Sequence, residues 1–163
     1  MPTIFFKNIP NQALAFAIGT VAIGLVLRIW HFVGARSLWI DEAMIGKNII
    51  DRSFAQLFQS LDYGQIAPIG WLILEKVAYN MIGGLEYSLR LAPFIFGIAA
   101  LGVFSWLTLR CFKGILAPIV IFLFAINPRL IFYSAEVKQY GADVFFSSLL
   151  TLIAFYFLAR ERV

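Results

Sequence analysis

Two adjacent carboxylates, Asp41 and Glu42, are the residues of this sequence best suited to do chemistry. They follow the first long apolar run and open a polar, aromatic-rich stretch. Paired acids of this kind suit the deprotonation of a hydroxyl group, or the binding of a divalent cation beside a phosphate. A helix that begins here would accept one acid at its positive N-terminal end, so the structural and the catalytic interpretations both stay open.

A second polar group precedes the last apolar run, and its spacing is i, i+3, i+4, i+7: Glu136, Gln139, Tyr140 and Asp143. On a helix these four side chains share one face. A polar stripe at a membrane edge faces protein or water, and a helix end solvated by lipid headgroups is the alternative. Three basic residues are expected near the acids, where they could bind a phosphate-bearing substrate: Arg90, Arg129 and Lys138.

The composition determines which solvent surrounds these residues. Of the 163 residues, 61% are hydrophobic and 17% are aromatic, and the mean hydropathy is +0.86. A water-soluble globule of this composition would expose large apolar patches, so the sequence predicts an all-α integral membrane protein. The 13 Lys and Arg residues stand at the ends of apolar runs and do not cluster. This placement indicates membrane topology and argues against nucleic acid as a partner.

Four segments approach the roughly 20 apolar residues that a bilayer-spanning helix needs: 13–33, 91–109, 115–133 and 143–159. A fifth, 66–82, carries Glu75 and Lys76 at its middle. If it spanned, Arg110 and Lys113 would lie outside, against the positive-inside tendency. We therefore expect it to lie in the interface. The cytoplasmic basic residues are then Lys7, Arg110, Lys113, Arg160 and Arg162, and the external loops are 34–90 and a short one near 133–142.

The long external loop is expected to contain juxtamembrane helices. Apolar residues in 45–61 follow helical spacing, which predicts an amphipathic helix resting on the outer leaflet. A second helix is expected from Pro68 to Ile82, with Glu75 and Lys76 on its solvated edge. Arg28 and His31, near the end of the first span, are expected to snorkel or to make local hydrogen bonds.

Four stretches resemble, in order and spacing, a known pattern: 37–43 (SLWIDEA), 63–68 (YGQIAP), 83–93 (GGLEYSLRLAP) and 133–143 (YSAEVKQYGAD). The chain is similar to the N-terminal portion of the C-type glycosyltransferases. The nearest likeness is to bacterial relatives of dolichyl-phosphate-mannose protein mannosyltransferases and of lipid A aminoarabinose transferases. One departure concerns Ala67, because many members carry His or Lys at this position before the proline.

The resemblance implies transfer of a sugar from a polyprenyl-phosphate donor to a lipid, glycan or protein acceptor. The implied location is the extracytoplasmic face of a multi-pass protein in the inner or plasma membrane. Asp41 matches the acid that serves as the base or positions the acceptor, and Glu42 supports it. Asp143 is the closest match to the second acid and Glu136 is the alternative. The remaining substrate-binding candidates are Gln65, Arg90, Arg129, Lys138 and Tyr140. A divalent metal ion is the candidate cofactor, with its ligands unassigned.

The resemblance also implies that 1–163 is a single membrane module, the N-terminal part of a larger transferase. A truncated, non-catalytic subunit that binds lipid-linked intermediates or a partner enzyme is the alternative function. A proton- or ion-coupled transporter is a third, but it predicts acids near the bilayer midplane. Here Asp41 and Asp143 both map to one interface, which argues against a transporter.

Overall fold

The computed structural model describes residues 10–34, 36–83 and 86–161, and every regular element within these ranges is a helix. The long helices are α1 (Asn11–Val33), α4 (Glu86–Cys111) and α7 (Tyr140–Glu161). The shorter ones are α2 (Ile40–Asp51), α3 (Ile69–Ile82), α5 (Leu116–Ala125) and α6 (Pro128–Tyr133), with 3₁₀ turns η2 (Gln56–Phe58) and η3 (Asp62–Gly64). Helices α1, α4 and α7 are long and apolar enough to cross a membrane, so the expected all-α membrane fold is confirmed.

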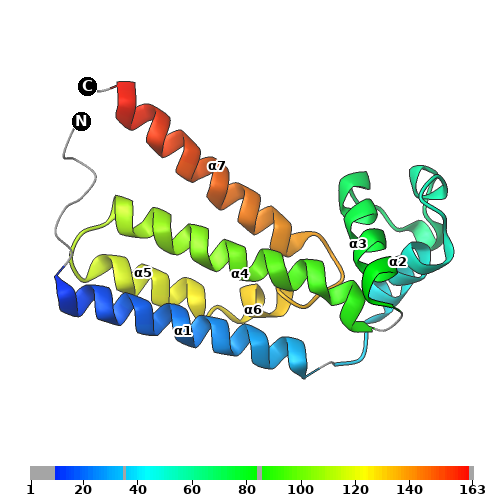
Figure 1. Cartoon of the computed structure of the whole chain (residues 1–163), viewed down its shortest axis with the longest axis horizontal. Coiled ribbons are helices and arrows are strands. Elements are labelled where there is room, and N and C mark those ends of the chain that lie inside the picture. Colours follow the sequence, from blue (N-terminus) through cyan, green and yellow to red (C-terminus); the bar gives the residue numbers. More distant parts are fainter. Residues whose placement is uncertain (1–9, 35, 84–85, 162–163) are drawn as a thin grey trace.

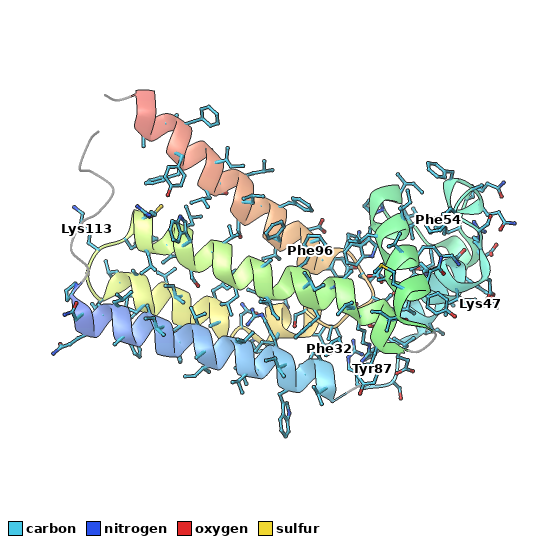
Figure 2. The ribbon with its side chains drawn as sticks, in the orientation of Figure 1. Phe32, Lys47, Phe54, Tyr87, Phe96 and Lys113 are labelled. Atoms are coloured by element: carbon cyan, nitrogen blue, oxygen red, sulfur yellow. The ribbon has the colours of Figure 1, made fainter. Side chains whose placement is uncertain are left out.

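The long helices form a bundle, and α2 and α3 gather at one end of it (Figure 1). Helix α4 is central, because it packs against α1, α5 and α7. The start of α1, the turn between α4 and α5, and the end of α7 lie at the opposite end (Figure 1). Figure 2 shows Lys113 at this far end and Lys47 on the α2–α3 unit. The two sets of loops expected on opposite sides of a membrane are therefore separated by the length of the bundle.

The α2–α3 unit has an apolar core of its own. The core residues come from α2, η2, α3, α4 and the loop before α7: Ile45, Ile49, Leu57, Leu72, Leu89 and Val137. The apolar face of the expected 45–61 helix thus packs mainly against protein, although Phe54 and Phe58 remain exposed. The helix also ends at Asp51 and does not reach residue 61. Beyond it, the side chains of Ser53 and Gln56 bond to each other's backbone N–H groups, and such local bonds compete with helix.

Helix α3 agrees with one expectation and contradicts another. Its 14 residues are fewer than the roughly 20 that a span needs, and it lies beyond the end of the bundle with α2 (Figure 1). Glu75 and Lys76, however, are not on a solvated edge, because they are 0% and 8% exposed. The Nζ atom of Lys76 donates a hydrogen bond to the carbonyl oxygen of Ile50 at 2.9 Å, which ties α3 to the last turn of α2.

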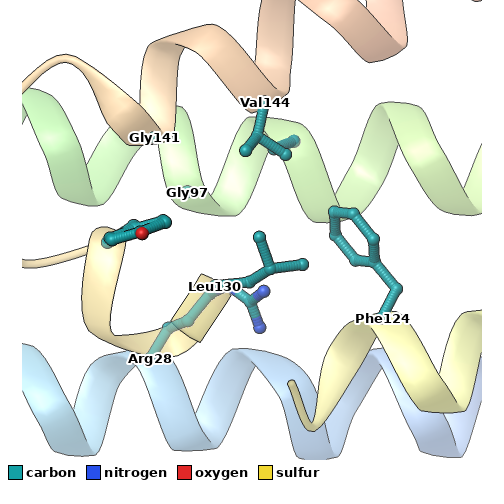
Figure 3. Close-up of a pocket in the computed structure, with 8 residues that line it drawn as sticks. Arg28, Gly97, Phe124, Leu130, Gly141 and Val144 are labelled. Atoms are coloured by element: carbon teal, nitrogen blue, oxygen red, sulfur yellow. The ribbon is translucent and has the colours of Figure 1, made fainter. Parts of the chain in front are cut away.

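The expected span 115–133 is broken into α5 and α6. Pro128 cannot donate to a preceding turn, and Asn127 caps the new helix by accepting from the backbone N–H of Arg129 at 2.9 Å. Arg28 of α1 satisfies a carbonyl freed by the break: its Nη1 donates to Ala125 at 3.1 Å and to Gly24 at 2.9 Å. Arg28 therefore does not snorkel. Its guanidinium points into a small cavity, roomy enough for about one water molecule, between the helices (Figure 3).

Small residues let the broken segment approach its neighbours closely. A Cβ atom on Gly24 would lie 2.8 Å from that of Ala125, and one on Gly97 would collide with the Cβ of Ser134. Gly102 on the same helix as Gly97 has nothing within 4 Å of such an atom. The contact of α4 with the end of α6 therefore requires glycine at position 97.

Some residues used in the sequence analysis lie outside the described part of the chain. They are Lys7 and Arg162, which carry part of the charge argument, and Gly84 and Leu85 of the third motif.

The first prediction concerns sidedness. Gln56 and Cys111 are both exposed and lie at opposite ends of the bundle. In sealed cells, a membrane-impermeant thiol reagent should label Gln56→Cys in a Cys111→Ser background and leave the native Cys111 unlabelled until the cells are opened. Labelling of Cys111 alone would reverse the assigned orientation.

The second prediction concerns the contact between α4 and α6. Gly97→Ala should lower the free energy of unfolding by about 1–3 kcal/mol, because the added methyl group overpacks the contact with Ser134. Gly102→Ala is the matched control, and it should leave stability unchanged or raise it by up to about 1 kcal/mol. Thermal unfolding in detergent measures both, and equal melting temperatures for the two variants would contradict the close approach.

Candidate functional site

Three segments distant in sequence meet where α2 joins the bundle. They are the 36–39 link with the first turn of α2, the 65–68 stretch before α3, and the loop 134–139 before α7. The backbone N–H of Val137 donates to Glu42 Oε1 at 3.0 Å, and Lys138 Nζ donates to Gln65 Oε1 at 3.0 Å. The candidate residues Glu42, Gln65 and Lys138 are therefore brought together by the fold.

Glu42 is the anchor of this arrangement. It is fully buried, and its second oxygen accepts from the backbone N–H of Trp39 at 2.9 Å and pairs with Arg36 Nη2 at 3.1 Å. Because both carboxylate oxygens are occupied, Glu42 is not free to take a proton from a substrate. Its geometry suits the supporting role expected for it, which is to hold the 134–139 loop against α2.

Asp41 is exposed, unlike its neighbour. Consecutive residues on a helix point about 100° apart, so when Glu42 faces the protein interior Asp41 faces outward. Its charge still reaches the loop before α7, where it acts on both Glu136 and Tyr140. The two acids of the pair thus have different environments, one buried and paired, one open to solvent.

The polar residues before α7 do not form the expected helical stripe. Helix α7 begins only at Tyr140, so Glu136 and Gln139 belong to the loop, whereas Tyr140 and Asp143 are in the first turn. The loop shape nevertheless leaves Glu136 Oε2 and Gln139 Oε1 buried without a hydrogen-bond partner. Tyr140 packs against Tyr133 with ring centroids 4.9 Å apart, and Asp143 is exposed.

Glu136 is electrostatically the most perturbed acid of the site outside the spanning helices. Burial raises the pKa of its carboxyl group, and the negative charges of Glu42 and Asp41 raise it further; Arg36 and Lys138 oppose the shift. The group therefore holds its proton to a higher pH than an ordinary glutamate does.

Two arginines supply the positive side of the site. Arg90 is fully buried, and its Nη2 donates to the carbonyl oxygen of Arg36 at 2.6 Å, while its Nε and Nη1 make no hydrogen bond. Arg36 stacks on the ring of Phe132 at 4.2 Å, and its Nε and Nη1 are also unbonded. His31 lies against the same ring at 5.9 Å, with an unbonded Nε2.

Sequence reasoning missed Arg36. The available signal was a lone cation five residues before Asp41. Arg129 is the opposite case: it is exposed in the first turn of α6, and within the described part of the chain no ion pair or side-chain hydrogen bond joins it to the other candidates. The basic residue found beside the acids is thus Arg36, where Arg129 was expected.

The described side chains do not assemble a metal site. No group of three or more His, Cys, Asp or Glu side chains among them is arranged to hold an ion, and the oxygens of Glu42 are already bonded to Trp39, Val137 and Arg36. No step proposed below is therefore routed through a metal.

Comparison of the chain with protein-family models, with curated proteins and with solved structures finds no match.

The third prediction concerns the different contributions of Glu42 and Asp41 to stability. Glu42→Ala should destabilise the protein, because a buried amide left unpaired at Val137 costs about 1–3 kcal/mol. Asp41→Ala, the matched control, should change stability by no more than about 0.5 kcal/mol, since its side chain is exposed. Chemical unfolding in detergent micelles and protease sensitivity of the 134–139 loop report both effects. Equal losses in the two variants would remove Glu42 from its anchoring role.

Proposed function

We propose that this chain is a membrane glycosyltransferase, or the N-terminal catalytic module of one. It transfers a sugar from a polyprenyl-phosphate donor to an acceptor on the extracytoplasmic face of the inner or plasma membrane. The expected location follows from the basic residues Arg110 and Lys113, which lie at the end of the bundle away from the site.

One observation carries the proposal: unpaired donors and unpaired acceptors occur on neighbouring segments of the site. Arg90 bonds to the backbone of Arg36, and the charges of Arg36 and of the exposed Asp41 both act on Glu136. The donors are N–H groups of Arg36 and Arg90, and the acceptors are oxygens of Glu136 and Gln139. Buried polar groups in proteins are nearly always bonded, so this set indicates a ligand that both accepts and donates. A phosphate joined to a polyol has this chemistry, because its phosphate oxygens accept from guanidinium groups and its hydroxyls donate to carboxylate and amide oxygens.

The reaction is a single displacement with inversion. Asp41 takes the proton of the acceptor hydroxyl, the acceptor oxygen bonds to the anomeric carbon, and the bond from that carbon to the phosphate oxygen breaks. The phosphate leaves with the bonding electrons. Arg36 and Arg90 stabilise the charge that develops on it. Arg90 is fully buried and Arg36 is 24% exposed, so their N–H groups act in surroundings where electrostatic interactions are stronger than in water. Glu136, Tyr140 and Asp143 are the residues that we assign to the sugar and the acceptor, because they are close enough to Asp41 or to each other for their charges to interact.

The fourth prediction tests the base. Asp41→Asn should lower the transfer rate by about 10²- to 10⁴-fold, the usual contribution of a general base, because the amide cannot accept the proton. The assay is transfer from a polyprenyl-phosphate sugar in membranes that contain the protein. Binding of the donor should be retained, since the phosphate meets arginines. A fully active Asp41→Asn protein would contradict the assigned role.

Substitution of the arginines distinguishes binding from chemistry. Arg36→Lys keeps the charge beside Glu42 but removes the planar donor fork, so it should weaken donor binding more than Arg129→Lys, which changes an exposed residue away from the site. A protein that binds the donor through Arg36 yet never transfers the sugar would instead be the non-catalytic subunit that binds lipid-linked intermediates.

A further inference from the structure

Glu75, on the inner face of α3, is a second unpaired acid, and it lies outside the site described above. Its side chain is 0% exposed, and neither carboxylate oxygen has a hydrogen-bond partner. The Nε1 atom of Trp71, one helical turn earlier, is likewise buried and unbonded. An ionised carboxylate in this position would lack both water and hydrogen bonds, which is a very costly state.

The position of Glu75 in the fold matters more than its burial. Leu72 of α3 belongs to the core shared with α2 and α4, and Trp71 packs against Ala92 of α4 and Ala142 of α7. Glu75 follows Trp71 by four residues and Leu72 by three, so its side chain lies on the same face of α3, one turn further along. It therefore lies in the layer that joins the α2–α3 unit to the bundle.

Among the residues that the structure describes, no charged neighbour compensates this acid. The other ionisable side chains on α3 are Lys76 and Tyr79; those on α2 are Asp41, Glu42, Lys47 and Asp51; those on the first turns of α4 are Glu86, Tyr87 and Arg90. None of them shifts the pKa of Glu75, which burial alone raises well above its usual range. Lys76 bonds to the carbonyl oxygen of Ile50, away from this acid.

We propose that Glu75 is a protonation-controlled lock between the α2–α3 unit and the membrane helices. While its carboxyl group is neutral, α3 packs on α4. When it ionises, the carboxylate must be hydrated and α3 separates from α4. The separation reaches the functional site, because Lys76 ties α3 to α2, which carries Asp41, and because Gln65, just before α3, bonds to Lys138.

The direction of the pH effect follows from linkage. An acid whose pKa is raised in the packed state stabilises that state at low pH, and this advantage is lost as the pH rises above the ordinary glutamate value. Between the ordinary glutamate pKa and the raised pKa of the packed state, one proton is released on opening. The equilibrium constant for opening should therefore increase by about tenfold per pH unit in this interval. The lock accordingly opens in alkaline and closes in acidic surroundings. Only its effect on transfer depends on the function proposed above.

Hydrogen exchange of the α3 amides, measured on the purified protein in lipid nanodiscs, tests the lock without any assay of transfer. After correction for the intrinsic pH dependence of exchange, protection of α3 in the wild-type protein should fall with rising pH. Glu75→Gln, which imitates the neutral acid, should make protection independent of pH. Asp51→Asn is the matched control: it removes one exposed acid of α2 and should keep the wild-type profile. Identical profiles for the wild type and Glu75→Gln would overturn the proposal.

Infrared spectroscopy gives a second measurement, because it reports the protonation state of Glu75 and not the protection of α3. In a Glu136→Gln background, which removes the other acid with a raised pKa, the closed protein should show the carbonyl band of a protonated carboxylic acid. Adding Asp51→Asn should retain this band and adding Glu75→Gln should abolish it. Absence of the band at a pH where α3 is protected would show that Glu75 is ionised and that no lock exists. A pH-dependent α3 in a protein that never transfers sugar would support the lock and contradict the proposed function.

Discussion

The buried carboxylate of Glu42 is the interaction on which the candidate site depends. It receives hydrogen bonds from its own helix start and from the loop before α7, and it pairs with Arg36. The hydrogen bond from Val137 joins segments 95 positions apart in sequence. Among the described contacts, no other hydrogen bond ties the loop before α7 to α2. Since a carboxylate buried with its partners is strongly destabilised when one partner is lost, the three segments must form together.

Several features of the fold could be predicted because they follow from local physics. The apolar lengths of α1, α4 and α7 are those of membrane-spanning helices, and α3, with 14 residues, is too short to be one. The break at Pro128 agrees with the inability of proline to continue a helix. The sequence could not show that Arg28 would satisfy the carbonyl of Ala125, since that contact joins residues 97 positions apart.

The site was only partly predictable for the same reason. Asp41 and Glu42 were recognised as an acidic pair, but only the helix start at Ile40 decides which of them is buried. The helical stripe expected across 136–143 fails because the loop continues to Gln139, held by the bond from Val137 to Glu42. Glu75 was interpreted as solvated because a charge in an interfacial helix usually is; its burial depends on how α3 packs on α4. Tertiary contacts therefore determine what residue type and spacing leave open.

The bond between Arg28 and Ala125 has a consequence for biosynthesis. A chain leaving the ribosome inserts its segments in order, and α5 with its proline break would enter the bilayer with an unbonded carbonyl. Helix α1 is already present by then and supplies the guanidinium from its buried face, so the early segment completes the later one. Its own arginine, costly in lipid when alone, is in turn neutralised in part by the negative end of α5. Each helix thus lowers the free-energy cost of placing the other in lipid.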